Sequence, residues 1–304
     1  MEIINPIGVM LIALGGPESL EEVSSFMTAF LERPIPSQLL DAVTARYRLI
    51  GGKSPLPALV RAQAEKLGRE LGDRFLAMAG FRHGYPSIEK TFAELARIGI
   101  PKLIALPMSP YYSTVTTGAY RKALKDAESL SPETEVVFID SWHDHPSFIK
   151  AWTEQLRQDL NHFPCDRQSR VQVIFSAHSI PMKYIQAGDP YQKQIAETVN
   201  RIVDCLELKF WHLAYQSKGV RSMESWLGPE VEQVLDEIEA AGFKDVLQVP
   251  IGFTCDHLET LYDIEIVHRK YAEQKGLNFH RAESLNVSPI FIKALADIVK
   301  AHLQ

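Results

Sequence analysis

The amino-acid sequence predicts an α/β fold of two similar lobes, each a parallel sheet flanked by helices. Short, wholly apolar runs alternate with amphipathic stretches along the chain. Such runs are typical of strands buried on both faces, and their alternation with helices favours parallel pairing. The two halves also repeat one pattern, which indicates two lobes of the same architecture.

The expected strands are apolar runs, and the expected helices carry apolar residues at helical spacing. The strands lie at 9–14, 103–106, 136–139, 171–175 and 246–249. The helices lie at 20–31, 58–71, 87–98, 146–160, 191–206, 230–241 and 289–303. Strand and helix therefore alternate often enough to build a parallel sheet in each half.

The repeat is clearest where strands end. An apolar strand runs into a polar turn at 14–17 (LGGP) in the first half and at 176–179 (SAHS) in the second. Later in each half come a glycine-containing turn and a strand with a proline, at 99–112 and 242–253. Ligands of such folds bind beyond the carboxyl ends of the strands, so functional residues should follow strands.

The chain of 304 residues is long enough for one large domain or two ordinary ones. The lobes are expected to join within residues 140–165. This gives a first lobe at 1–150 and a second at 151–304, with the C-terminal helix as a candidate to pack back on the first lobe.

Composition is that of an ordinary globular protein, with 46% hydrophobic and 23% charged residues. The formal net charge is -6 and the pI about 5.9, and no basic stripe appears. Phosphate binding normally requires such a stripe. Nucleic acid is therefore not an expected partner.

Three cysteines, Cys165, Cys205 and Cys255, lie far apart without a CxxC pair. A structural zinc or an iron–sulfur cluster within the chain is not expected, and the sparse set fits a reducing cytosol. The apolar run at 9–14 is too short for a signal peptide, and nothing approaches the ~20 residues of a spanning helix. The expected location is cytoplasmic, with membrane contact at most peripheral.

His178 is the first candidate for chemistry. It follows the predicted strand at 171–175 among small polar neighbours, and Pro181 ends the turn. An imidazole in this position projects into the crevice of a parallel sheet, where it can take protons or bind a metal. The alternative is a histidine that only hydrogen-bonds the turn.

A row of carboxylates follows the next strand end. Asp256, Glu259 and Asp263 recur at i, i+3 and i+7, which would place them on one face of an α-helix. The buried side of that helix is marked by Leu258, Leu261 and Ile264. Like charges stacked this way destabilise a helix, so they favour a path for a divalent cation or for protons. The alternative is a solvated acidic face.

The first expected helix carries an apolar lip of Phe26, Met27, Phe30 and Leu31, next to Arg33. Such a stripe is usually core. Four large apolar residues crowded around one turn could instead grip a flat hydrophobic ligand or touch a bilayer.

Over essentially its whole length the sequence resembles the ferrochelatases. The resemblance rests on segments spread in order along the chain. They are LGGPESLEEV at 14–23, RYRLIGGKSPL at 46–56, SPYYSTVTTG at 109–118, FSAHSIP at 175–181, GDPY at 188–191, YQSK at 215–218, WLGP at 226–229, TCDHLETLYD at 254–263 and RAESLN at 281–286.

The resemblance implies the chelatase fold, two Rossmann-like lobes with a porphyrin cleft between them, and assigns roles to residues. His178 matches the histidine close to the pyrrole nitrogens, Glu259 the carboxylate paired with it across the ring, and Asp263 the next acidic step outward. Both His178 and Glu259 are thus implied as catalytic, and all three as contacts for the metal. The residues implied to bind the porphyrin are Leu14, Tyr47, Ser54, Arg82, Trp226, Phe253 and His257.

The implied reaction inserts Fe²⁺ into protoporphyrin IX to give protoheme, with release of two protons. It needs a base for the pyrrole protons, carboxylates to strip water from the cation and a tight apolar cleft to bend the ring. A mixed histidine–carboxylate site suits ferrous iron, though not exclusively. Ferrous iron is then a substrate, and no permanently bound cofactor is expected.

Three departures from the family pattern bear on the site. Val267 stands where many relatives continue the acidic row, so the outer metal path is shorter or runs through Glu265. His83 replaces a common tyrosine. The chain ends at Gln304 without the cysteine-bearing tail that holds a cluster in some relatives, so no iron–sulfur cluster is expected.

Leu14 favours protoporphyrin IX, because enzymes that use the more carboxylated coproporphyrin often carry a tyrosine there. A coproporphyrin III ferrochelatase is the alternative, and a sirohydrochlorin chelatase is weaker because those enzymes tend to use paired histidines. A porphyrin or heme carrier without catalysis is the alternative from another class. Transient contact with a membrane or with an upstream porphyrin-producing enzyme is compatible with the apolar lip.

Overall fold

The computed structural model describes residues 6–219 and 224–303, which form two compact units. Unit 1 takes the chain up to Trp142 together with Cys255–Leu258 and the segment from Asn286 onward. Unit 2 consists of His143–Thr254 and Glu259–Leu285. Each unit contains one parallel four-stranded sheet, which confirms the predicted fold class.

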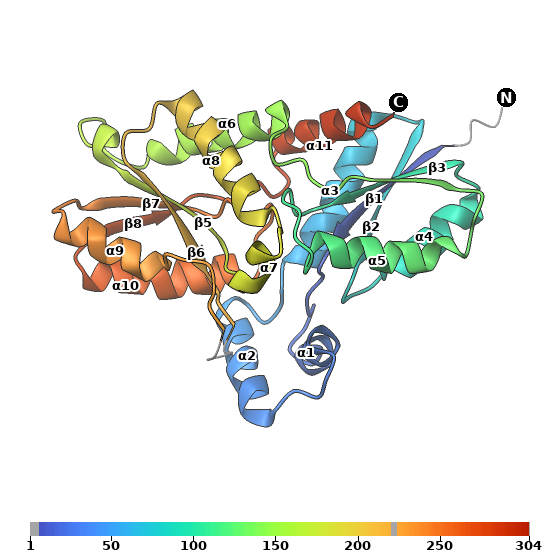
Figure 1. Cartoon of the computed structure of the whole chain (residues 1–304), viewed down its shortest axis with the longest axis horizontal. Helices are drawn as coiled ribbons and strands as arrows, with labels where there is room; N and C mark the ends of the chain where they lie inside the picture. The colour runs from blue at the N-terminus through green and yellow to red at the C-terminus, as the bar shows by residue number, and fades with distance from the viewer. Residues whose placement is uncertain (1–5, 220–223, 304) are drawn as a thin grey trace. The chain divides into compact units, whose positions relative to one another are not determined.

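Unit 1 orders its strands β2-β1-β3-β4. They are β1 (Ile7–Ala13), β2 (Phe75–Phe81), β3 (Lys102–Pro107) and β4 (Glu135–Phe138). Its helices are α1 (Val23–Leu31), α2 (Ser37–Leu49), α3 (Leu56–Leu71), α4 (Ile88–Ile98), α5 (Thr117–Glu128) and α11 (Pro289–Ala301). α4 and α5 cover one face of the sheet, while α3 lies against β1 and β2 and is joined by α11 (Figure 1).

The core of unit 1 follows from the apolar patterns of its elements. Met10 and Ile12 of β1 are fully buried against Phe92 of α4 and Leu124 of α5. Leu67 of α3 is also fully buried. Because β1 is central and buried on both faces, it reads as a continuous apolar run.

Unit 2 orders its strands β6-β5-β7-β8, the same permutation as unit 1. They are β5 (Gln172–His178), β6 (Trp211–Gln216), β7 (Asp245–Val249) and β8 (Asn278–Arg281). Its helices are α6 (Pro146–Leu160), η1 (Gln168–Arg170), α7 (Met182–Gln186), α8 (Tyr191–Leu206), α9 (Val231–Ala240), η2 (Glu259–His268) and α10 (Arg269–Gln274). α6 and α8 lie on one face of the sheet, with α9 and α10 on the other (Figure 1).

The equal strand orders explain the repeat in the sequence. Leu14 follows β1 and His178 ends β5, so the two polar turns occupy equivalent places in the two sheets. The later repeat, at 99–112 and 242–253, contains β3 and β7, which are also equivalent. The strand order reverses between β5 and β7, and ligands of open parallel sheets bind beyond such a switch point.

Strands β2, β6 and β8 and helices α2, α5, α7 and α10 had no counterpart in the sequence reasoning. All three strands lie at sheet edges. β6 and β8 begin with exposed residues and carry polar side chains, so neither is a continuous apolar run. β2 is apolar but rich in alanine and glycine, which have low strand propensity. Across the residues that the structure describes, no helix combines the length and apolarity needed to cross a bilayer.

Candidate active site

The turn after β7 packs directly against the end of β5. Gly252 donates its N–H to the Ser176 carbonyl at 3.1 Å. A Cβ on Gly252 would stand 2.7 Å from the Cβ of Ala177, so only glycine permits this approach. The close packing leads the chain from β7 toward Glu259, which begins η2.

His178 and Glu259 lie side by side in unit 2. The Nε2 atom of His178 is 3.5 Å from Oε1 of Glu259, and both side chains are partly exposed, at 36% and 28%. The Nδ1 atom of the ring contacts the carbonyl of Ser179, which can only accept, so Nδ1 carries the hydrogen. In the neutral ring, this tautomer turns the lone pair of Nε2 toward the carboxylate.

Two buried residues hold the main chain around His178. The hydroxyl of Tyr191, at the start of α8, donates to the His178 carbonyl at 3.1 Å. Ser179 donates its N–H to the Gln216 carbonyl and its hydroxyl to the Leu227 carbonyl, each at 2.8 Å. Sequence reasoning gave neither residue a role, although both lie in segments that carry the family resemblance. Their partners are distant in sequence, which hides these contacts from local patterns.

Glu259–His268 is a π-helix, and this corrects the predicted α-helical acidic row. Hydrogen bonds of a π-helix run from residue i to i+5, so residues four apart share a face. The buried face is Thr260, Ile264 and His268, whereas Leu261, which the α-helical spacing placed inside, is only partly buried. Glu259 and Asp263 remain on a common face, and the hydroxyl of Ser217 donates to the Asp263 carboxylate.

Asp256 does not belong to that row, because it precedes the helix and lies in unit 1. Its N–H donates to Oδ1 of Asn286 at 2.9 Å, and Nδ2 of Asn286 donates back to the Asp256 carboxylate at 2.9 Å. These two hydrogen bonds tie the segment before the helix to Asn286. His257 beside it contacts the carbonyl of Cys255 at 3.2 Å.

The other candidates in unit 2 flank the same strand ends. Trp226 forms an isolated antiparallel bridge with Pro181, three residues after His178. Phe253 lies in the turn after β7 and is partly buried. Trp226 therefore belongs to the segment after β6, and Phe253 belongs to the segment after β7.

In unit 1, Leu14, Ser54 and Arg82 gather around the carboxyl end of β1. Arg82 donates its main-chain N–H to the Ala13 carbonyl at 3.0 Å, and His83 donates its main-chain N–H to the Leu14 carbonyl at 2.8 Å. Ser54 is buried, and its N–H donates to the Pro17 carbonyl at 2.8 Å. The Arg82 guanidinium lies 3.6 Å from the Glu32 carboxylate.

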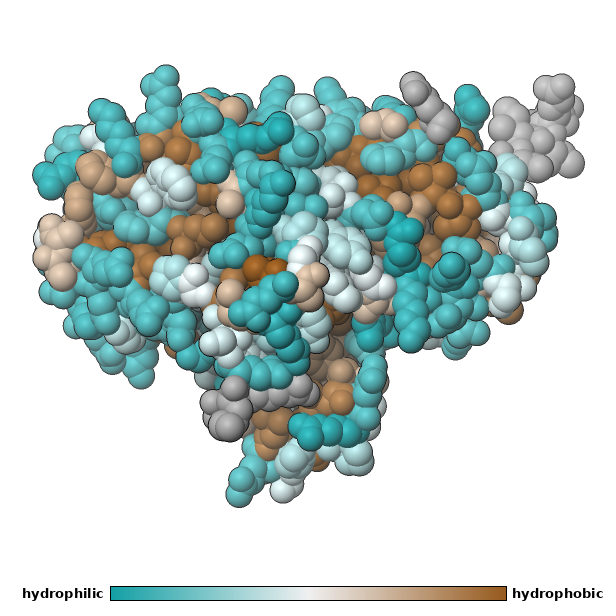
Figure 2. All heavy atoms as spheres, viewed as in Figure 1, coloured by the Kyte–Doolittle hydropathy of each residue, from teal (hydrophilic) through white to brown (hydrophobic). Residues whose placement is uncertain are grey.

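Tyr47 is only 4% exposed and packs with Val23 and Val43 between α1 and α2. The apolar lip is divided. Met27 packs against that cluster, whereas Phe26 and Phe30 stack with centroids 6.3 Å apart. His83 meets both rings edge-on, at 6.4 and 5.9 Å. Phe30 is 46% exposed, and Figure 2 shows apolar side chains at the surface over α1 and α2.

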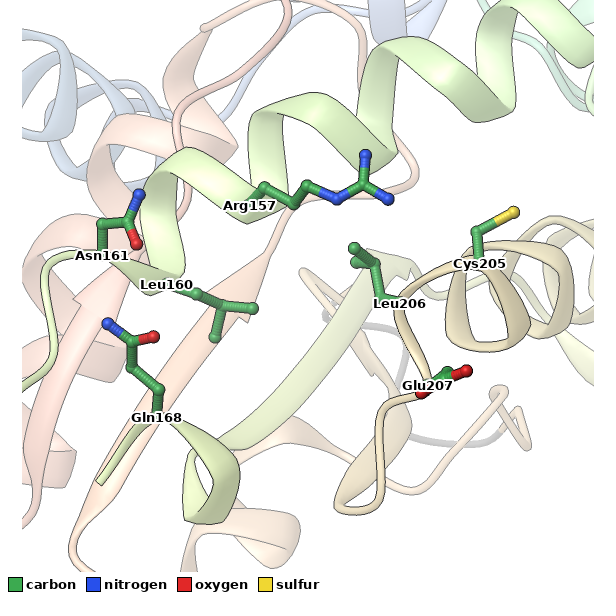
Figure 3. A pocket seen from close by; sticks show the side chains of 7 residues that line it. All are labelled: Arg157, Leu160, Asn161, Gln168, Cys205, Leu206 and Glu207. Carbon is green, nitrogen blue, oxygen red and sulfur yellow. The ribbon is translucent and has the colours of Figure 1, made fainter. Parts of the chain in front are cut away.

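Within the described ranges, no group of three His, Cys, Asp or Glu side chains converges to hold a metal. A hollow of about 500 Å³ lies elsewhere in unit 2 (Figure 3). It is lined by Arg157, Leu160, Asn161, Gln168, Cys205, Leu206 and Glu207. The residues that line it come before β5 and β6 in the chain, so the hollow lies at the amino end of the sheet, whereas His178 lies at the carboxyl end.

Comparison with solved structures places the fold among the chelatases. SirB from Bacillus subtilis, solved with Fe³⁺, superposes with a TM-score of 0.60 at 13% identity, covering 97% of this chain and 94% of SirB. CbiX, described as the terminal enzyme of siroheme biosynthesis in denitrifying bacteria, superposes with a TM-score of 0.55 at 10% identity, covering 98% and 100%.

Sequence comparison reaches further than the fold. The family model described as ferrochelatase matches residues 6–303. The ferrochelatase of Deinococcus radiodurans is 38% identical over 302 residues, covering 97% of this chain and 95% of that protein. The mitochondrial ferrochelatase of Bos taurus is 36% identical over 323 residues, covering 98% and 77%. With that identity sustained over nearly its whole length, this chain belongs to the ferrochelatase family.

Proposed function

We propose that this chain inserts ferrous iron into protoporphyrin IX, forming protoheme and releasing two protons. The observation that carries the proposal is the contact of His178, at the end of β5, with Glu259, at the start of η2, in a chain of the ferrochelatase family. The enzyme is a lyase of the type that forms nitrogen–metal bonds. Iron and porphyrin are its substrates, and no resident cofactor is required.

His178 is proposed to take the pyrrole protons. Its Nδ1–H donates to the Ser179 carbonyl, which leaves Nε2 as the basic atom of the ring. Tyr191 and Ser179 hold the strand end, so this atom has a defined direction. General base catalysis requires a basic atom that is held in a defined direction toward the proton it takes.

Glu259 and Asp263 are proposed to bring in the iron. The π-helix places them on one face, and carboxylate oxygens can replace water around a divalent cation. The carboxylate of Glu265 is engaged by the guanidinium groups of Arg269 and Arg281. Val267 is 38% exposed and offers no ligand. These contacts support a path that ends at Asp263 rather than one that continues through Glu265.

The family resemblance supports the proposal that Leu14, Ser54, Arg82 and His257 contact the porphyrin. It supports the same role for Trp226 and Phe253. Leu14 is apolar and follows β1, which supports protoporphyrin IX over a more carboxylated ring. Tyr47 is proposed to support the porphyrin site indirectly, by packing between α1 and α2, because so little of its side chain is exposed.

The exposed Phe30 supports a proposal that the α1 surface receives the porphyrin during transient contact with a membrane or with an upstream porphyrin-producing enzyme. A cytoplasmic location with peripheral membrane contact is part of the same proposal.

The decisive experiment is anaerobic incubation with ferrous iron and either protoporphyrin IX or coproporphyrin III, followed by absorbance of the metalloporphyrin. Turnover of protoporphyrin IX at the higher kcat/KM is the expected result. Preference for coproporphyrin III would overturn the choice of ring and keep the reaction. Failure to metallate either ring would overturn the proposed function.

A further inference from the structure

A row of buried polar side chains lies beneath η2 and has no part in the roles described so far. It consists of His268 on the helix, Gln248 in β7, Ser176 in β5 and Gln216 at the end of β6. None of the four is more than 4% exposed. β7 is central, and such strands are normally apolar on both faces, so a fully buried glutamine there departs from the pattern.

Gln248 is the centre of this row. Its Oε1 lies 3.1 Å from Nδ1 of His268. Its Nε2 donates to the hydroxyl of Ser176 at 2.9 Å and to Oε1 of Gln216 at 3.2 Å. Both amide hydrogens and the carbonyl oxygen are therefore used, which fixes the orientation of the amide.

The row ends on the two carboxylate residues of the candidate site. Nε2 of Gln216 donates to the main-chain carbonyl of Glu259 at 3.3 Å and approaches the hydroxyl of Ser217 at 3.4 Å. The Ser217 hydroxyl donates in turn to the carboxylate of Asp263. Gln248 is thus linked through Gln216 to the backbone of one carboxylate residue and to the side chain of the other.

His268 is a neutral donor in this arrangement. Burial lowers its pKa to about 4, so the ring is uncharged at neutral pH. With Gln248 as acceptor, the hydrogen resides on Nδ1. The carboxylate of Glu232, 3.8 Å from Nε2, then forms no ion pair with the ring. Primary amides do not relay protons readily, so the row holds groups in place rather than conducting protons.

We propose that Gln248, oriented by His268, is a positioning residue for iron delivery, because through Gln216 it sets the place of Glu259 and Asp263 on the π-helix. The proposal rests on the proposed function. A π-helix is rarely favoured by sequence alone, and its buried face here is short. A hydrogen-bonded anchor in the sheet explains how the two carboxylates keep one register.

The chain offers a matched control. Gln172, the first residue of β5, is a second buried glutamine of the same sheet and is 3% exposed. Its Oε1 lies 3.1 Å from Nε2 of His212. It has the same amide–imidazole pairing but lies at the amino end of the strand that His178 ends. Gln248→Leu and Gln172→Leu therefore remove equivalent buried amides at opposite ends of β5 and β7.

The test compares the two variants in anaerobic metallation and in binding of Co²⁺ to the porphyrin-free protein. Gln248→Leu should lower kcat/KM for iron and weaken Co²⁺ binding, each about ten-fold or more, as loss of an outer partner of a metal site typically does. Its KM for porphyrin and all constants of Gln172→Leu should stay within about two-fold. Equal behaviour of the two variants in both assays would overturn the proposal.

A second pair of variants decides the matter if Gln248→Leu does not fold. His268→Gln retains a donor for Oε1 of Gln248 and should keep iron kinetics near those of the original chain, whereas His268→Leu should repeat the loss. Equal iron kinetics in these two would also overturn the proposal. An original chain that binds Co²⁺ but metallates no porphyrin would contradict the proposed function alone, since the Co²⁺ comparison still tests the positioning.

Discussion

The Nε2 atom of His178 faces Oε1 of Glu259 at 3.5 Å, while Nδ1 of the same ring is held by the Ser179 carbonyl. In the neutral ring, the Nε2 lone pair and the carboxylate are both acceptors, and they face each other. A proton or a divalent cation satisfies both at once. This relationship makes the two side chains separable by mutation, because one is an imidazole and the other a carboxylate.

Replacing His178 by alanine should abolish iron insertion. Loss of a general base typically lowers turnover by about 10²–10⁴-fold. The ring is partly exposed, so the fold should survive, as circular dichroism and thermal unfolding would check. His302→Ala, on a histidine at the end of α11 in unit 1, is the control and should metallate porphyrin normally. Normal turnover of His178→Ala would remove this residue from the mechanism.

Glu259→Gln keeps the shape of the side chain but removes its charge. Turnover should fall by about 10²-fold or more, while porphyrin affinity, measured by absorbance titration, should change little. Glu265→Gln is a control on the same helix, since its carboxylate is engaged by arginines. A non-catalytic porphyrin carrier would instead show no consequence of Glu259→Gln in any assay.

Asp159 provides a pH-dependent test of stability. It is 1% exposed, and burial raises its pKa to about 6 from 3.8, although Gln155 donates to its carboxylate. A raised carboxyl pKa means that the protonated carboxyl favours folding. The stability that the protonated Asp159 contributes is therefore present at pH 4 and is lost as the pH rises through 6.

Asp159→Asn should therefore gain stability at pH 7.5, by about 1–3 kcal/mol, and little at pH 4. Urea unfolding at the two pH values measures this difference. Asp73→Asn, at an exposed position after α3, should show no such dependence on pH. A gain of equal size at both pH values would mean that the effect is packing rather than titration.

Gly252→Ala tests the contact between the turn after β7 and the end of β5. The new methyl group would stand 2.7 Å from the Ala177 Cβ, so the protein should lose about 1–3 kcal/mol of unfolding free energy. Iron insertion should also weaken, because Ala177 precedes His178. Gly68→Ala is the matched control. Gly68 lies inside helix α3, and a Cβ there would be 3.6 Å from the nearest atom. This substitution should leave the unfolding free energy unchanged or raise it.

The central strands and the long helices could be predicted because their signals are local. β1, β3, β5 and β7 are fully or largely buried and read as apolar runs, and α6 and α8 match the predicted 146–160 and 191–206. The edge strands β6 and β8 were not predicted, because their exposed and polar residues interrupt such a run. Residues that follow central strands, such as His178, were therefore found directly.

The support of the site could not be predicted in this way. Tyr191, Ser217 and Gln248 act through partners 13, 46 and 20 residues away. The π-helix was read as an α-helix, which brought Asp256 into a row with Glu259 that the structure does not form. Apolar spacing differs little between the two helix types over so few residues.

By itself, the sequence determined the doubly repeated α/β architecture, the placing of His178 and Glu259 after strands, and the membership of the ferrochelatase family. Tertiary structure alone decided how those two side chains meet, which nitrogen of His178 faces Glu259, and which buried amides hold the helix that carries Asp263. The physical reason is that strand and helix patterns arise from burial along neighbouring residues. Hydrogen-bond partners, by contrast, are chosen only when distant segments pack together.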